Sequence, residues 1–284
     1  MIESRSLGSK IFDIFNHTFL LLVGLVSLLP FVYIVVTSFS ATSDLIPKSF
    51  TTEAYQYIFS ADTFTKSLLV SIFVTLVGTF VQLALSCLMA YSLSHTHLPG
   101  RGFFLMMVLI TMLFSGGMIP TYFVVQQTGL LNSLWALIIP NAISAFYLII
   151  LKNFFQSIPN ELKESAKIDG AHELTVLFRI VLPLSLPALA AFGLFYAVGI
   201  WNQYFNAILY ISDPALYPVQ VILRQLIILS SGAIGDSTSI ETIPYHGQAI
   251  QMAVIVVATL PIIILYPFLQ KHFAKGVLLG SVKG

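Results

Sequence analysis

Charged side chains are scarce in this sequence. Only 9% of its 284 residues are Asp, Glu, Lys or Arg, whereas a typical soluble protein carries about 25%. Hydrophobic residues make up 57% of the chain. This balance excludes an ordinary soluble domain and predicts an integral membrane protein.

The residues that several chemistries require are also missing. Cys87 is the single cysteine, so no disulfide can form within the chain. No G-x-x-x-x-G-K-[ST] phosphate-binding loop occurs, so an ATPase that drives this protein must be another subunit. Ion-coupled carriers usually place ionisable residues at membrane depth, and membrane hydrolases need a His, Asp or Cys constellation there. We find neither pattern, and we therefore expect a protein that is not an enzyme, with no catalytic residues and no metal site.

Long hydrophobic runs are abundant. Six runs have about the 20 residues that a helix needs to cross a bilayer, and none of them contains any of the 25 charged residues, of which 13 are basic and 12 acidic. The sequence therefore predicts an all-α, polytopic membrane protein in which residues 1–284 form one domain with six transmembrane helices. The runs are Asn16–Phe39, Ser67–Leu93, Phe103–Val125, Ser133–Leu151, Pro183–Tyr210 and Gln248–Leu269.

The basic residues predict the orientation of the chain. With both termini in the cytoplasm, ten Lys and Arg lie inside and three outside, as the positive-inside rule favours. A cleavable signal peptide is the competing interpretation of the first run, but the run is too long for one, so we expect a retained helix. The external segment Ser40–Lys66 has room for a short helix around Glu53–Phe59, and the external segment Ile211–Gly247 contains Val219–Leu229, whose apolar residues can lie along the interface or cap a cavity.

The largest charged segment, residues 157–182, predicts a cytoplasmic helix-turn-helix. Pro159 suits the first turn of a helix, Gly170 can end it in the left-handed conformation, and a second helix can follow from Ala171. The central string reads E-x-A-x-x-D-G-A, and composition alone equally allows an ordinary charged loop. The candidate coupling residues are Glu164, Ala166, Asp169, Gly170 and Ala171.

The fifth run contains a cluster of amides and aromatic rings. Amides can bond sugar hydroxyls, and aromatic rings can stack on the C–H faces of a sugar. We predict a path for an uncharged, hydroxyl-rich substrate, although an interfacial aromatic belt with interhelical amide bonds would have the same residues. The same two interpretations apply to the isolated Gln82, Asn141 and Tyr147, where the structural one is stronger. The candidate substrate-path residues are Trp201, Asn202, Gln203, Tyr204 and Asn206.

The end of the chain, residues 271–284, is too short and too often interrupted by glycine to form another span. It is also too apolar for a purely solvated tail, so we expect it to bury against a partner. The alternative is a disordered end that anionic lipids hold through its lysines.

The charged string, followed by Leu182-Pro183, resembles the EAA loop of permease subunits in ATP-driven, binding-protein-dependent importers. Ser165 stands where the second alanine of that signature is usual. Further segments extend the resemblance to MalG-type permeases of carbohydrate importers, and most closely to the LplC/YtcP-like oligosaccharide branch. These segments are Phe114–Tyr122, Asn153–Pro159, Trp201-Asn202, Ser212–Pro214 and Lys275–Gly284.

This resemblance implies a type I ABC importer permease fold in the bacterial cell membrane. It implies a second homologous permease subunit, two ATP-binding subunits and an extracellular sugar-binding protein, with substrate moved by alternating access. ATP and Mg would be bound by the ATPase subunits, so we expect no cofactor in this chain, lipids around it and no nucleic-acid partner. The resemblance also places a tail at the interface between the ATPases, through Lys275, Gly276, Gly280 and Lys283. A stand-alone channel or facilitator for uncharged solutes is the alternative function.

Overall fold

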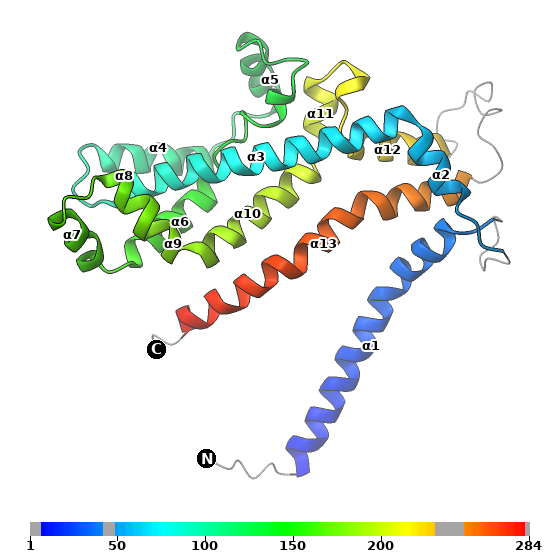
Figure 1. The fold of residues 1–284 in the computed structure, drawn as a ribbon, viewed down its shortest axis with the longest axis horizontal. Coiled ribbons are helices and arrows are strands. Elements are labelled where there is room, and N and C mark those ends of the chain that lie inside the picture. Colours follow the sequence, from blue (N-terminus) through cyan, green and yellow to red (C-terminus); the bar gives the residue numbers. More distant parts are fainter. Residues whose placement is uncertain (1–6, 42–48, 231–246, 282–284) are drawn as a thin grey trace. The chain divides into compact units, whose positions relative to one another are not determined.

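The computed structural model describes residues 7–41, 49–230 and 247–281 (Figure 1). Within these ranges, the side chains at 7, 229–230, 266 and 268–281 are not described. The described residues form helices joined by turns and contain no strand beyond an isolated bridge between Ser40 and Phe50. The predicted all-α class is therefore confirmed.

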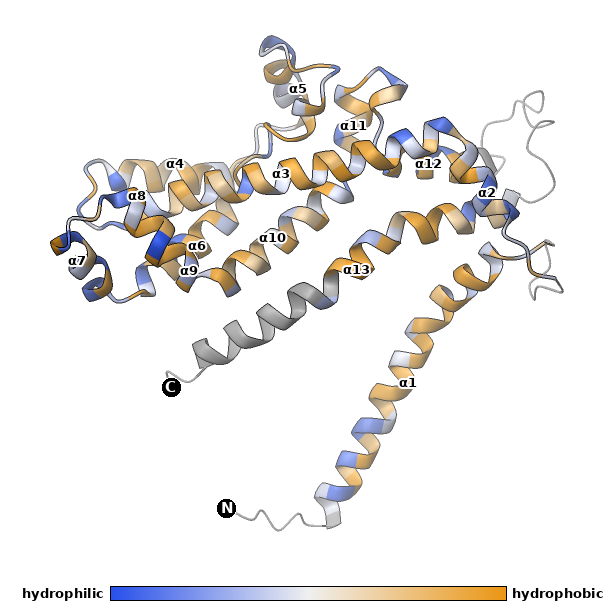
Figure 2. Cartoon of the chain, in the orientation of Figure 1, coloured by the Kyte–Doolittle hydropathy of each residue, from blue (hydrophilic) through white to orange (hydrophobic). Residues whose placement is uncertain are grey.

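The chain divides into two compact units, Met1–Ala61 with Gln225–Thr259, and Asp62–Arg224 with Leu260–Gly284. In the first unit, α1 (Leu7–Ser38) is hydrophobic along most of its length, as Figure 2 shows. It is tied to α2 (Glu53–Ser60) by a 2.7 Å hydrogen bond between the hydroxyls of Ser38 and Tyr55. That a single domain spans residues 1–284 stays a prediction.

The second unit is organised around α3 (Asp62–Ser94), which packs against α6 (Ala145–Ser157) and α10 (Leu186–Trp201). Two glycines allow this close approach. A Cβ on Gly78 would lie 2.8 Å from Ile200 Cδ1, and one on Gly193 would lie 3.2 Å from Leu83 Cδ1. Small residues at helix crossings are typical of membrane proteins, because they bring the backbones together. The remaining helices of this unit are α4 (Arg101–Leu113), α5 (Met118–Gln127), α7 (Asn160–Ile168), α8 (Glu173–Val176), α9 (Leu182–Leu184) and α11 (Phe205–Tyr210).

Three of the predicted spans are broken rather than continuous helices. Phe103–Val125 divides into α4 and α5, because Phe114 is extended and Gly117 has a φ of +85°. Ser133–Leu151 begins with a short 3-10 helix, Leu134–Leu137, and becomes α-helical only at Ala145. Pro183–Tyr210 divides into α9, α10 and α11.

By length and apolar composition, three described helices can cross a membrane, namely α1, α3 and α13 (Gly247–Ser281). A fourth span is available if residues 173–184 and α10, which meet at an angle of 84°, form one bent crossing. The bend follows from Pro183 and Pro187, which lack the N–H that a continuous helix needs. That the chain crosses six times stays a prediction. Outside these spans, the predicted short helix at Glu53–Phe59 is confirmed as α2, and Val219–Leu229 lies in a further helix, α12 (Val219–Ser230).

Candidate coupling loop and substrate path

The predicted turn at Gly170 is confirmed, with a φ of +84°. The N–H of Gly170 donates to the carbonyl of Lys167 at 3.0 Å, and the N–H of Ala171 donates to that of Ala166 at 2.9 Å. These two bonds form a Schellman motif, which satisfies carbonyls that the end of α7 would otherwise leave unpaired. The second helix starts at Glu173 rather than at Ala171. It continues through a π-helical turn, Leu177–Val181.

Side chains of this segment and of α6 also donate hydrogen bonds to backbone carbonyls at the C-terminal ends of α6 and α3. Lys163, which is buried, donates from Nζ to the carbonyl of Phe155 in α6 at 2.9 Å. Gln156 donates from Nε2 to the carbonyl of Ser94 at the end of α3, at 3.1 Å. Burial lowers the pKa of Lys163, and the charge of Lys167 lowers it further. The first bond fixes the loop to the end of α6, and the second fixes α6 to the end of α3.

The carboxylate of Glu173 contacts three side chains at once. One carboxylate oxygen accepts a hydrogen bond from the Tyr91 hydroxyl at 2.7 Å and lies 3.7 Å from His95 Nε2, and the other accepts from Lys167 Nζ. The hydrogen bond from Lys167 holds the pKa of Glu173 below its usual value. The stabilisation is thus present at neutral pH and is lost as the pH falls through that lowered pKa. These contacts join α7, α8 and the end of α3.

We expect Glu173→Ala to loosen this junction without unfolding the helices. Loss of hydrogen bonds at a half-exposed carboxylate costs about 1 kcal/mol, or about fivefold in the ratio of native to non-native conformations of the loop, which sets the upper limit of the effect. If the loop transmits movement into α3, transport by the assembled protein should fall by up to about fivefold, while its melting temperature changes little. Glu161→Ala removes an exposed carboxylate from α7 and serves as the matched control. Equal transport by the two variants would show that the Glu173 contacts are dispensable.

The outer surface of the loop combines charge with exposed apolar side chains. Glu164 and Asp169 are exposed, while Ala166 and Ala171 are half-buried against the core. The Ile168 side chain is 87% exposed. Figure 2 shows hydrophilic residues gathered on α7. Exposed apolar residues beside charges are typical of a protein-docking surface. The large apolar residues exposed here are Leu162, Ile168, Leu174 and Phe178.

A polar cleft of about 250 Å³ lies between α3, α6 and the α10–α11 turn. It contains two of the predicted substrate-path residues, Gln203 and Asn206. With them are Gln82, Asn141 and Tyr147, whose separation in the sequence gave no sign that they meet. Gln82 Nε2 donates to the Asn141 carbonyl at 2.9 Å, and Gln203 Nε2 donates to that of Leu137 at 3.3 Å. Aromatic side chains of Tyr147, Phe195 and Tyr196 line the same cleft.

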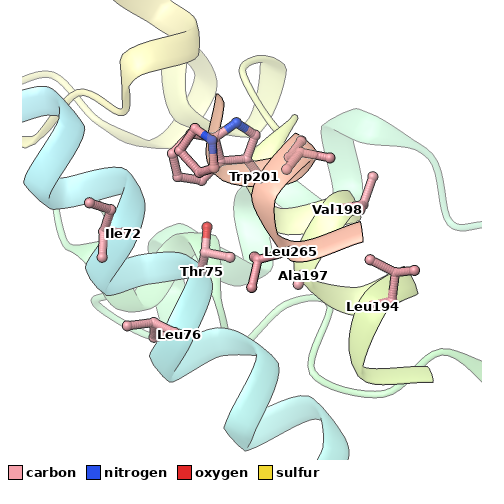
Figure 3. Close-up of a pocket in the computed structure, with 10 residues that line it drawn as sticks. Ile72, Thr75, Leu76, Leu194, Ala197, Val198, Trp201 and Leu265 are labelled. Atoms are coloured by element: carbon pink, nitrogen blue, oxygen red, sulfur yellow. The ribbon is translucent and has the colours of Figure 1, made fainter. Parts of the chain in front are cut away.

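The other predicted substrate-path residues lie elsewhere. Trp201 is buried and lines a separate apolar cavity of about 120 Å³ with side chains such as Thr75 and Leu265 (Figure 3). Asn202 is exposed, and its side chain donates to the Val198 carbonyl at 2.9 Å, which caps α10. The ring of Tyr204 lies under the Arg224 guanidinium, 4.5 Å from the ring centroid. The structure thus separates residues that are adjacent in the sequence.

The predicted tail is only partly described. Helix α13 continues through Ser281, so Lys275, Gly276 and Gly280 lie within a helical backbone. Their side chains are not described, and Lys283 lies outside the described residues. The role of these four residues stays a prediction.

Comparison with known proteins gives concordant matches. Residues 58–279 match the family model described as "Binding-protein-dependent transport system inner membrane component". The polygalacturonan/rhamnogalacturonan transport system permease protein YtcP of Bacillus subtilis is 56% identical, over 97% of this chain and 99% of that protein. Protein LplC of the same organism is 54% identical, over 98% of this chain and 96% of its own length. The resemblance to the LplC/YtcP-like branch is therefore confirmed.

A solved structure matches the fold. It is a crystal structure of a bacterial ABC transporter involved in the import of the acidic polysaccharide alginate. The similar chain has a TM-score of 0.85 and 32% sequence identity, and the match covers 94% of this chain and 98% of the other. The predicted type I ABC importer permease fold is thereby confirmed.

Proposed function

This chain belongs to the family of inner membrane components of binding-protein-dependent transport systems, and we propose that it is the permease subunit of an ATP-driven importer of oligosaccharides. Two similarities support the choice of cargo. The name of the 56% identical relative gives polygalacturonan and rhamnogalacturonan as its substrates, and the transporter of similar fold imports alginate.

The observation that carries the coupling role is the construction of the loop at residues 157–182. A Schellman turn fixes its tip at Gly170, and Glu173 and Lys163 tie it to α3 and α6. Its outer surface leaves charged and apolar side chains exposed for a partner. Glu164, Ala166, Asp169, Gly170 and Ala171 would dock on a separate ATPase, whose closure would move α3 and α6. A stand-alone channel would have no need for such a loop.

The complete importer would contain a second homologous permease, two ATPase subunits that bind ATP and Mg, and an extracellular sugar-binding protein. Both termini would face the cytoplasm, as the distribution of Lys and Arg favours. The C-terminal segment would reach the interface between the ATPases. ATP would shift the complex between inward- and outward-open states because the ATPases bind the two states with different free energy.

Purification of the assembled complex tests this proposal. We expect the chain to co-purify with a second permease and with ATPase subunits. In proteoliposomes, the complex should take up oligosaccharides only when ATP and the loaded binding protein are both supplied. Uptake by this chain alone, without ATP, would instead identify a facilitator.

A further inference from the structure

The polar cleft bounded by Gln82, Gln203 and Asn206 suggests a more specific role than a general path. This inference rests on the proposed function. We propose that the cleft is a subsite in this subunit for one uncharged pyranose residue of the transported oligosaccharide, and that it disfavours a uronate at that position.

The size of the cleft sets the size of the ligand. Its volume of about 250 Å³ is just below the range of about 300–1,000 Å³ that is usual for pockets holding drug-sized ligands. One sugar ring fits this space better than a chain of several residues does. The remaining residues of the oligosaccharide would have to lie outside the cleft.

The walls of the cleft suit the two surfaces of a sugar ring. Tyr147 stacks on Phe195, with ring centroids 5.7 Å apart and an interplanar angle of 11°, and meets Tyr196 edge-on at 5.2 Å. This rigid aromatic cluster provides an apolar surface for the C–H face of a ring. The amides of Gln203 and Asn206 provide donors and acceptors for hydroxyl groups.

Gln82 has unused hydrogen-bonding capacity. Its side chain is 4% exposed, and its amide nitrogen is paired with the Asn141 carbonyl. The amide oxygen is buried and has no hydrogen-bond partner among the described residues. An unpaired buried acceptor is costly and therefore unusual. In this structure the oxygen is closed off from the cleft, so a sugar hydroxyl donates to it once the Gln82 amide rotates toward the cleft, whereas a carboxylate has no proton to donate.

The lack of charged residues in the lining of the cleft defines which sugars it prefers. None of the ten residues that line it is Asp, Glu, Lys, Arg or His. A carboxylate moved from water into such a site loses its hydration and gains no cation from the residues of this chain that line it. Arg224 in α12 lies over the ring of Tyr204, and neither residue lines the cleft. A neutral ring carries no such penalty.

Two labelled, α-1,4-linked trisaccharides test this subsite, galactotriose and trigalacturonate, in which a carboxylate replaces each C6 hydroxymethyl group. Equilibrium binding is measured on the purified assembled complex in detergent, without binding protein, so that the signal comes from the membrane subunits. We expect galactotriose to bind more tightly than trigalacturonate. Gln82→Met and Asn206→Ala should each weaken galactotriose binding about three- to tenfold, as for the loss of one hydrogen bond.

Two further variants sharpen the experiment. Gln127→Ala removes an exposed amide at the end of α5 and should leave binding unchanged. Gln203→Arg places a cation in the cleft and should shift the preference towards trigalacturonate. Asn206→Ala is the decisive substitution. The Asn206 side chain makes no hydrogen bond within the described residues, so its removal should not alter the melting temperature of the complex.

The outcomes separate the subsite from the proposed function. If the wild-type complex takes up no oligosaccharide with ATP and binding protein, the proposed function fails and the subsite fails with it. If the complex is an active importer but binds both trisaccharides equally, or if Asn206→Ala and Gln82→Met leave galactotriose binding unchanged, the subsite alone is wrong.

Discussion

Gly170→Val should uncouple the protein, with uptake by the assembled importer falling by up to about five- to thirtyfold. The φ of Gly170 is +84°, and no atom lies within 4 Å of the position that a Cβ would occupy. The damage would therefore come from backbone conformation rather than from a clash. The left-handed region costs an L-residue about 1–2 kcal/mol, and a β-branched residue is the least tolerated there. That free energy corresponds to a factor of about 5–30 in the ratio of native to non-native conformations of the turn, which sets the upper limit of the loss of uptake.

A matched series separates turn geometry from general damage. Asn enters the left-handed region more readily than other residues do, so Gly170→Asn should retain most of the uptake, and Gly170→Ala should lie between Asn and Val. Complex assembly and melting temperature should change little across the series, because Gly170 is exposed. Normal uptake and normal sugar-stimulated ATPase activity in Gly170→Val would contradict the coupling role of the turn.

Local signals in the sequence were sufficient for this turn. The charged helix α7 ends at Asp169-Gly170, and the hydrogen bonds that cap it connect residues at most five apart. The local sequence is therefore enough to predict where this helix ends. The interruptions at Gly117 and before Ala145 also have visible signals, in Gly116-Gly117 and Pro140. A count of hydrophobic residues averages over such signals, and for this reason continuous spans were expected there.

The polar cleft could not be predicted from one sequence. Gln82 and the Asn141 carbonyl are 59 residues apart and are joined only after α3 packs against the segment that leads into α6. Periodicity identifies which residues share the face of one helix, but not which faces meet. Adjacent residues on a helix also point about 100° apart. This is why Trp201 lines an apolar cavity while Asn202 is exposed, although they are neighbours in one motif.

Gly78→Leu should destabilise the second unit more than any surface change, because α3 and α10 touch at this glycine. A Cβ there would lie 2.8 Å from Ile200 Cδ1 and 3.4 Å from Ile138 Cγ1. Extra methylene groups in a well-packed core cost about 1–3 kcal/mol. We expect a lower melting temperature and a lower yield of the subunit purified in detergent. Gly24→Leu, in an equally helical position with no atom within 4 Å of a Cβ, is the control.

A double variant tests whether the contact with Ile200 is the cause. Ile200→Ala opens space opposite Gly78 and should itself destabilise the core, as large-to-small substitutions do. Combined with Gly78→Leu it should recover part of the loss, giving an interaction free energy of about 0.5–3 kcal/mol. Because Ile200 also lines the polar cleft, the melting temperature and not galactotriose binding measures this recovery. Strictly additive effects of the two substitutions would show that α3 and α10 do not meet at Gly78 and Ile200.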